Sequence, residues 1–227
     1  MLTVCNLEFR YPNSPFELNV PQLDIANQQH TAITGPSGCG KTTLLNLIAG
    51  IKPVHAGLSG EITLNHERLL DKSDQQQRQF RLDNVGFVFQ DFRLIEYLSM
   101  RDNILLPVML SSLPQDAEIA ERLDYLIQKM GLSELSNRQV SQFSRGEQQR
   151  IAICRALLNK PQLILADEPT ANLDADNAKQ VWDLLFEQAN EINATLIVVT
   201  HAADNLDRFS QVLPFSQINA GGQLCST

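Results

Sequence analysis

A glycine-rich segment near the start of the sequence lies between a short strand pattern and a helix pattern. It fits GxxxxGK[ST] and consists of Gly35, Pro36, Ser37, Gly38, Cys39, Gly40, Lys41 and Thr42. Thr31 to Thr34 before it reads as a strand, and Thr42 to Ala49 has the apolar spacing of a buried helix. Glycines let the backbone curve so that successive N–H groups point inward, and the helix start adds positive partial charge. This order predicts an α/β fold with a phosphate-binding loop.

The polar side chains of this loop have separate expected roles. We expect Lys41 to reach the β- and γ-phosphates of a nucleotide, Thr42 to ligate Mg²⁺ and Thr43 to donate to a phosphate. Cys39 lies inside the loop, where a helix N-terminus and a nearby lysine favour the thiolate form. We therefore also predict a reactive thiol at this position.

The apolar periodicity in the rest of the sequence predicts two antiparallel strands at the N-terminal end, followed by alternating strands and helices. Leu2 to Tyr11 and Phe16 to Ile25 alternate apolar with polar residues around a proline-containing turn. Further predicted strands are Ile62 to Leu64, Val85 to Phe89, Leu163 to Ala166 and Leu196 to Thr200, with a very polar segment at 71–79. Helical patterns fill 96–158, including Ala117 to Met130, and Asp176 to Asn190, and the tail is expected to end in a small strand and a Gly221-Gly222 turn. This alternation implies a mainly parallel sheet with helices on both sides.

Two carboxylates follow the apolar strand at 163–166. The C-terminal edge of a parallel sheet is where ligands bind in such folds, so Asp167 and Glu168 are expected to face the same crevice as the phosphate loop. Asp167 is then a candidate for holding Mg²⁺, directly or through water, and Glu168 a candidate general base for an attacking water. The pattern favours nucleotide hydrolysis.

Charge and composition exclude several other classes. The chain has 18 Lys+Arg against 26 Asp+Glu, a net charge of −8, which disfavours non-specific nucleic-acid binding. Met1 to Arg10 does not have the pattern of a secretory signal, and no apolar run reaches the length of a membrane-spanning helix. The four cysteines are far apart, without CxxC pairs, which argues against a zinc site or disulfides and fits a reducing cytoplasm.

A second motif makes the sequence resemble one family. Its residues are Ser144, Arg145, Gly146, Glu147, Gln148, Gln149 and Arg150. This stretch is similar to the signature of ABC transporter ATP-binding subunits, whose usual form is LSGGQ followed by QR. Other matches occur in the family's order: Tyr11 as the aromatic that stacks on adenine, Gln90 as the Q-loop glutamine, 171–174 as the D-loop and His201 as the switch histidine.

The resemblance covers essentially the whole chain and implies its architecture. Residues 1–227 would form a single ABC nucleotide-binding domain, a P-loop NTPase with a mainly parallel sheet, an antiparallel β subdomain and an inserted helical subdomain. The core would comprise 1–90 and 160–227, and the helical subdomain with the signature would run over about 91–159.

The resemblance also implies an ATPase with ATP and Mg²⁺ as its ligands. Two copies would close head to tail, with the signature of one copy capping the γ-phosphate held by the loop of the other. Ser144, Arg145, Gly146, Glu147 and Asp174 would then contribute to nucleotide binding. Glu168, His201 and Gln90 would be catalytic, and Gln90 would join Thr42 and Asp167 at the metal.

The signature of this chain departs from the usual form. Phe143 replaces leucine, Arg145 replaces the first glycine and Glu147 replaces glutamine. Arg145 adds bulk and charge near a closing interface, yet a guanidinium also attracts phosphate, so the sign of its effect stays open. Ser144 and Gly146, the positions expected to touch phosphate, are retained.

Residues 85–95 and Asn103-Ile104 resemble the branch that serves lipoprotein release and macrolide-type efflux, as does the sequence DEPTANLD at 167–174. This implies an integral membrane permease as partner, contacted through Asp91 to Leu106, no contact with nucleic acid, and a cytoplasmic location on the inner face of the membrane through that permease. Two alternatives stay open: a nucleotide-gated binding module with little turnover, in which Arg145 and Glu147 have cost activity, and a non-transport ABC ATPase.

Overall fold

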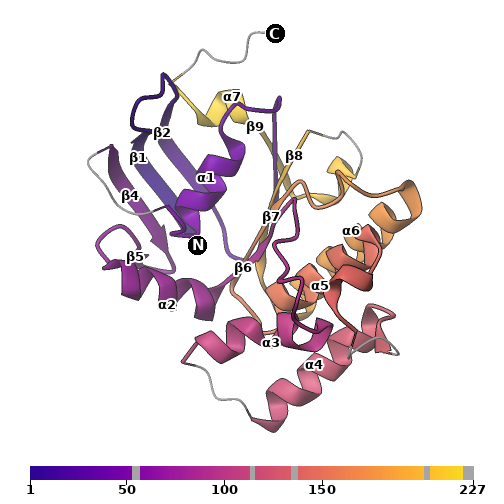
Figure 1. The fold of residues 1–227 in the computed structure, drawn as a ribbon. Coiled ribbons are helices and arrows are strands. Elements are labelled where there is room, and N and C mark those ends of the chain that lie inside the picture. Colours follow the sequence, from indigo (N-terminus) through magenta and orange to yellow (C-terminus); the bar gives the residue numbers. More distant parts are fainter. Residues whose placement is uncertain (53–56, 113–115, 134–137, 202–204, 222–227) are drawn as a thin grey trace. The chain divides into compact units, whose positions relative to one another are not determined.

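The computed structural model describes residues 1–52, 57–112, 116–133, 138–201 and 205–221 (Figure 1). These residues divide between two units. The first unit contains the described residues of 1–78 and 197–227, and the second those of 79–196. The second unit is thus an insertion, in sequence, between two parts of the first. Within the described residues, no helix is both long and apolar enough to cross a membrane.

An antiparallel sheet forms much of the first unit, with strand order β2-β1-β4-β5 (Figure 1). Its strands are β1 (Leu2–Arg10), β2 (Glu17–Ile25), β4 (Leu58–Leu64) and β5 (Glu67–Arg68). Alternate residues of β1 and β2 are buried, and the two strands pair antiparallel with Leu2 opposite Ile25. The two predicted antiparallel strands at the N-terminal end are therefore confirmed, because period-two alternation places one face of each strand in the core.

The rest of the first unit carries the predicted glycine loop. Strand β3 (His30–Thr34) precedes the loop and helix α1 (Lys41–Ile48) follows it. β3 pairs in parallel with β9 (Gln211–Pro214), and the strand order in this unit is β8-β3-β9. A short 3-10 helix, η3 (Leu206–Arg208), precedes β9, and the four-residue helix α7 (Phe215–Ile218) follows it. The small C-terminal strand was expected, whereas α7 was not.

The second unit contains two parallel strands that end at one edge. β6 (Val85–Val88) pairs in parallel with β7 (Leu163–Asp167), with Val88 opposite Ala166. β8 (Thr195–Thr200) is next to β7 in the strand order and crosses the boundary between the units. Every residue of β7 and β8 is buried. Full burial explains why both strands read as continuous apolar runs rather than alternating ones.

Within the described residues, four helices belong wholly to the second unit: α3 (Met100–Leu110), α4 (Ala117–Lys129), α5 (Arg145–Leu157) and α6 (Ala175–Glu191), with the 3-10 helix η2 (Val140–Gln142) before α5. Helix α2 (Asp74–Asn84) crosses the boundary between the units. Helix α5 packs against α3, α4 and α6 and is the central helix of this group. Helices α3 to α5 fall within the segment of about 91–159 that was predicted as the helical subdomain, and the limits of that subdomain stay a prediction.

Helix α2 lies in the polar segment where no helix was expected. Gln77 is its one buried residue, 4% exposed, and its amide donates to the backbone oxygens of Leu69 and Lys72 at 3.0 and 3.2 Å. A helix anchored by one buried amide has no apolar stripe, so hydrophobic periodicity could not reveal it.

Candidate functional site

The phosphate-loop candidate connects β3 to α1 in the first unit. Gly38 and Gly40 have positive φ angles of 79° and 113°. At Gly40 the φ angle is one that other residues rarely adopt, and a Cβ atom there would lie 2.8 Å from the Cζ atom of Phe16, so the Phe16 ring would have to shift. The loop therefore keeps the curvature that a phosphate cradle needs.

Lys41 is the first residue of α1 and is buried at 4% exposure. Its ammonium donates to the carbonyl oxygens of Gly35 and Pro36 at 2.8 and 2.7 Å. A buried cation requires such acceptors, and here both are neutral atoms of the loop itself. An anionic phosphate oxygen is a stronger acceptor than a carbonyl, so the lysine is positioned to exchange these bonds for bonds to phosphate.

The thiol of Cys39 lies in the same loop. Cys39 is 7% exposed, and the ammonium of Lys41 is 3.9 Å from its sulfur. This places the thiol beside the cation that was expected to activate it. Its reactivity stays a prediction.

Tyr11 and the threonines after Lys41 also belong to the first unit. Thr42 is exposed, whereas Thr43 is buried, with its hydroxyl 3.2 Å from the hydroxyl of Tyr11. The ring of Tyr11 lies near that of Phe16, at 5.7 Å between centroids, and Lys52 places its ammonium 4.8 Å from the ring centroid. Sequence analysis did not identify Phe16 or Lys52 as neighbours of the site, because Phe16 reads as the start of a strand and Lys52 belongs to no motif.

Two carboxylates end β7 in the second unit. Asp167 is 5% exposed, and Glu168, which is half-buried, follows with a φ angle of 45°. This left-handed conformation is costly for a residue other than glycine and is frequent at functional sites. A backbone bond of 3.2 Å from Ala171 N–H to the Glu168 oxygen closes the following turn.

Gln90 follows β6 and lies at the same sheet edge, since β6 and β7 run in parallel. Its side chain is exposed, and its backbone oxygen accepts a bond of 3.2 Å from the Asn172 amide. The structure of the second unit therefore brings the Q-loop candidate, the carboxylate pair and the D-loop together. His201 follows β8 in the first unit and is exposed. Its predicted contact with phosphate stays a prediction.

A side chain of α5 holds the segment after Gln90. Arg155 donates to the backbone oxygens of Phe92 and Arg93, each at 2.6 Å, and both of those residues have positive φ angles, of 60° and 47°. Burial lowers the pKa of Arg155 to about 10, so the guanidinium remains charged at neutral pH. Sequence reasoning missed Arg155, because the contact joins segments more than 60 residues apart.

The signature candidate forms the start of α5, with Ser144 as its N-cap. The backbone N–H and the hydroxyl of Ser144 both donate to the Glu147 carboxylate at 2.8 Å, and the Glu147 N–H donates back to the hydroxyl at 3.3 Å. The hydrogen bonds from the Ser144 hydroxyl and backbone lower the pKa of Glu147. The glutamate that departs from the usual motif thus completes a capping box. Arg145 is exposed.

The D-loop candidate Asp174 is the N-cap of α6. It accepts bonds from the backbone and side chain of Asn177 at 3.0 and 2.7 Å, and these bonds lower the pKa of Asp174. The oxygen of the Asn177 amide accepts from Arg150 at 3.0 Å and would lie 2.8 Å from a Cβ atom at Gly146. Asn177 therefore links the D-loop to the signature helix, a role with no sequence motif.

The predicted metal ligands offer a hydroxyl, an amide oxygen and a carboxylate, from Thr42, Gln90 and Asp167. Oxygen donors of this kind suit Mg²⁺, which is commonly held by one or two carboxylates together with phosphate oxygens and water. Among the described residues, no three His, Cys, Asp or Glu side chains gather into a metal-binding group. The donor set fits a metal that arrives with a nucleotide.

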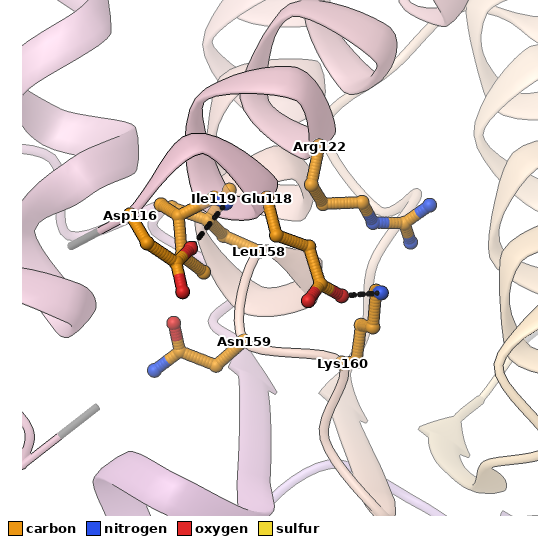
Figure 2. Close-up of a pocket in the computed structure, with 7 residues that line it drawn as sticks. All are labelled: Asp116, Glu118, Ile119, Arg122, Leu158, Asn159 and Lys160. Carbon is orange, nitrogen blue, oxygen red and sulfur yellow. Dashed lines mark hydrogen bonds and ion pairs between the residues drawn. The ribbon is translucent and has the colours of Figure 1, made fainter. Parts of the chain in front are cut away.

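A pocket elsewhere in the second unit has a volume of about 180 Å³ (Figure 2). It is lined by Asp116, Glu118, Ile119, Arg122, Leu158, Asn159 and Lys160. Figure 2 shows Glu118 paired with Lys160, at 2.6 Å, and Asp116 accepting from the Ile119 N–H at 3.2 Å. It contains none of the predicted site residues.

Comparisons with known proteins identify the family that this chain resembles in sequence and in structure. The sequence profile described as ABC transporter matches residues 18–171. The lipoprotein-releasing system ATP-binding protein LolD 1 of Rhodopirellula baltica is 35% identical over 93% of this chain and 92% of its own length. The uncharacterized ABC transporter ATP-binding protein YvcR of Bacillus subtilis is 42% identical over 82% of this chain and 70% of its own. The dimeric, post-hydrolysis structure of the ATP-binding cassette MJ0796, bound to ADP and Pi, has a TM-score of 0.82 at 31% identity and covers 94% of both chains.

Proposed function

The chain belongs to the ATP-binding proteins of the ABC transporter family and is an ABC ATPase, and from this premise we propose that it powers a separate membrane permease through ATP-dependent head-to-tail dimerisation. The observation that carries the proposal is the Lys41 ammonium, buried in a glycine loop and held by two neutral carbonyls. Such a cation binds a triphosphate without requiring another anion to leave.

Each predicted residue has a chemical role in this proposal. The loop amides and Lys41 bind the phosphates, and the face of the Tyr11 ring stacks on adenine. The carboxylate of Glu168 accepts a proton from water as the water oxygen bonds to the γ-phosphorus and the bond to the β-phosphate breaks. His201 contacts the γ-phosphate and orients the water.

Three side chains would hold the metal that accompanies ATP: Thr42, Gln90 and Asp167. Mg²⁺, when bound, neutralises charge on the β- and γ-phosphate oxygens. Asp167 is the ionic ligand of the set, and its position directly before Glu168 keeps metal binding and proton transfer on adjacent residues.

The signature and the D-loop supply the contacts between copies. Ser144 would offer its hydroxyl, and Gly146 its backbone N–H, to the γ-phosphate held by the partner copy, at the N-terminus of α5. The hydroxyl of Ser144 already donates to a carboxylate oxygen, so a phosphate oxygen replaces one anionic acceptor with another. Arg145 is exposed beside this contact, and Asp174 fixes the start of α6 next to it.

The likeness to lipoprotein-releasing ATP-binding proteins supports a permease of that kind as partner. We place the chain on the cytoplasmic, inner face of the membrane, with the membrane contacted only through the permease. Residues 91–106 form the docking segment in this proposal, and Arg155 fixes the start of that segment through Phe92 and Arg93.

Mixing two inactive variants tests the head-to-tail site. Lys41→Ala removes the loop cation, and Ser144→Arg blocks the signature, so each variant alone is expected to lose ATP turnover. In a heterodimer, one site combines an intact loop with an intact signature. An equimolar mixture is therefore expected to recover about a quarter of wild-type turnover, because half of the dimers each carry one intact site.

The control for this mixture is a double variant that carries both substitutions in one chain, mixed with Lys41→Ala. No heterodimer of that mixture has an intact site, so it stays inactive. An equimolar mixture of the single variants that shows no turnover above either variant alone contradicts the head-to-tail arrangement.

The partnership with a permease is tested by ATP turnover in two states. We expect the wild-type chain to copurify with an integral membrane protein, and its ATP turnover to change when that protein is present in lipid nanodiscs. The control is the chain with empty nanodiscs. Absence of turnover in both states favours the nucleotide-gated binding module, and equal turnover in both states favours a non-transport ABC ATPase.

A further inference from the structure

A buried glutamine of the signature helix reaches the turn that carries Glu168. Gln149, on α5, is 0% exposed, and its amide nitrogen donates to the backbone oxygen of Pro169 at 2.7 Å. Pro169 is itself buried and directly follows Glu168. The hydrogen bond thus holds the peptide group between Pro169 and Thr170, one residue beyond the residue assigned to proton transfer.

The turn that Gln149 holds has a costly backbone conformation. Glu168 has a φ angle of 45°, which only surrounding structure can maintain in a residue with a side chain. Pro169 has its own φ angle fixed by its ring, and the bond from Ala171 N–H closes the turn on the other side. From α5, the side chain of Gln149 adds a hydrogen bond to the backbone of this turn.

The amide of Gln149 also carries an unfavourable feature. Its oxygen is buried and has no hydrogen-bond partner among the described residues. An unpaired buried acceptor costs free energy, whereas methionine, which has nearly the same shape, would be buried without that cost. The feature of Gln149 that methionine lacks is the donor that meets Pro169.

We propose that Gln149 is a positioning residue that sets the orientation of Glu168 and couples it to the signature. Ser144, at the start of α5, and Gln149 are five residues apart, about 7.5 Å along one rigid helix. A change in the position of this helix when the signature meets phosphate is therefore passed to the Glu168 turn of the same copy. The inference rests on the proposed role of Glu168 as the base.

The test is Gln149→Met, with Gln77→Met as the matched control. Both glutamines are buried and donate to backbone oxygens, but the partners of Gln77, Leu69 and Lys72, belong to no predicted site. We expect Gln149→Met to lower kcat for ATP hydrolysis about tenfold with KM for ATP within twofold, because small displacements of a catalytic group have large rate effects. Gln77→Met is expected to keep wild-type kcat. Gln149→Leu is the second variant, should Gln149→Met fold poorly.

Thermal unfolding separates positioning from stability. The inference requires the fall in kcat although Gln149→Met unfolds at a Tm no lower than that of Gln77→Met. A kcat for Gln149→Met within twofold of wild type overturns it, and so does an equal loss of kcat in both variants.

A double variant separates this inference from the proposed function. In a Glu168→Gln background, Gln149→Met is expected to cause no further loss, because Gln149 acts through Glu168. Independent, multiplying losses overturn the inference and leave the base assignment intact. Wild-type hydrolysis in Glu168→Gln alone overturns the base assignment, and with it the inference.

Discussion

Glu168→Gln is expected to lower kcat for ATP hydrolysis by about 10²- to 10⁴-fold, the range that general-base catalysis contributes. Glutamine keeps the size of the side chain and its acceptor oxygen, but it cannot take a proton from the attacking water. ATP affinity should stay within about twofold, since Glu168 is not assigned to ground-state phosphate binding. Single-turnover phosphate release measures the chemical step, and titration with ATP measures Kd.

The same variant should accumulate as an ATP-bound dimer, because dimer opening follows hydrolysis in the proposed cycle. Size-exclusion chromatography with light scattering detects that species. Glu187→Gln is the control: it makes the same chemical change on α6, in the same unit, at a carboxylate paired with Lys129 at 2.6 Å. Wild-type turnover in Glu168→Gln refutes its assignment as the base.

The sequence predicted those elements whose burial follows a simple pattern, either alternating along the strand or continuous. The strands that form the first hairpin alternate, and β7 and β8 are buried throughout, so pattern and burial correspond directly. Helix α2 was not predicted, because its buried residue is the polar Gln77 and it has no apolar stripe. Helix α7 was not predicted, because its four residues are too few to show a helical period.

Motifs indicated the residues assigned to chemistry, but not those that hold them in place. Gly40 was predicted from its motif, whereas Phe16, whose ring lies against that glycine, was not. Asn177 and Arg155 act through contacts between segments distant in sequence. A motif describes neighbours along the chain, so contacts of this kind become visible only in the folded structure.

These contacts give the second unit a common centre. Three side chains of α5 reach three functional segments: Gln149 the Glu168 turn, Arg150 the start of α6 after the D-loop, and Arg155 the segment after Gln90. The N-terminus of the same helix is the signature. A displacement of α5 therefore changes the surroundings of the proposed base and of the proposed permease-docking segment together.

Lys41→Ala removes the buried cation of the glycine loop and is expected to weaken ATP binding by about ten- to 150-fold. Hydrogen bonds to charged groups contribute about 1.5–3 kcal/mol each, which is that range in Kd. Isothermal titration with ATP measures the loss, and ATP should raise the Tm of the variant less than that of wild type. Lys72→Ala removes the same charge from the same unit, at a side chain paired with Glu67 at 2.7 Å, and should keep wild-type affinity. Equal weakening of ATP binding in both variants would assign the effect to net charge. Unchanged ATP affinity in Lys41→Ala would contradict the role of Lys41 in phosphate binding, on which the proposed function rests.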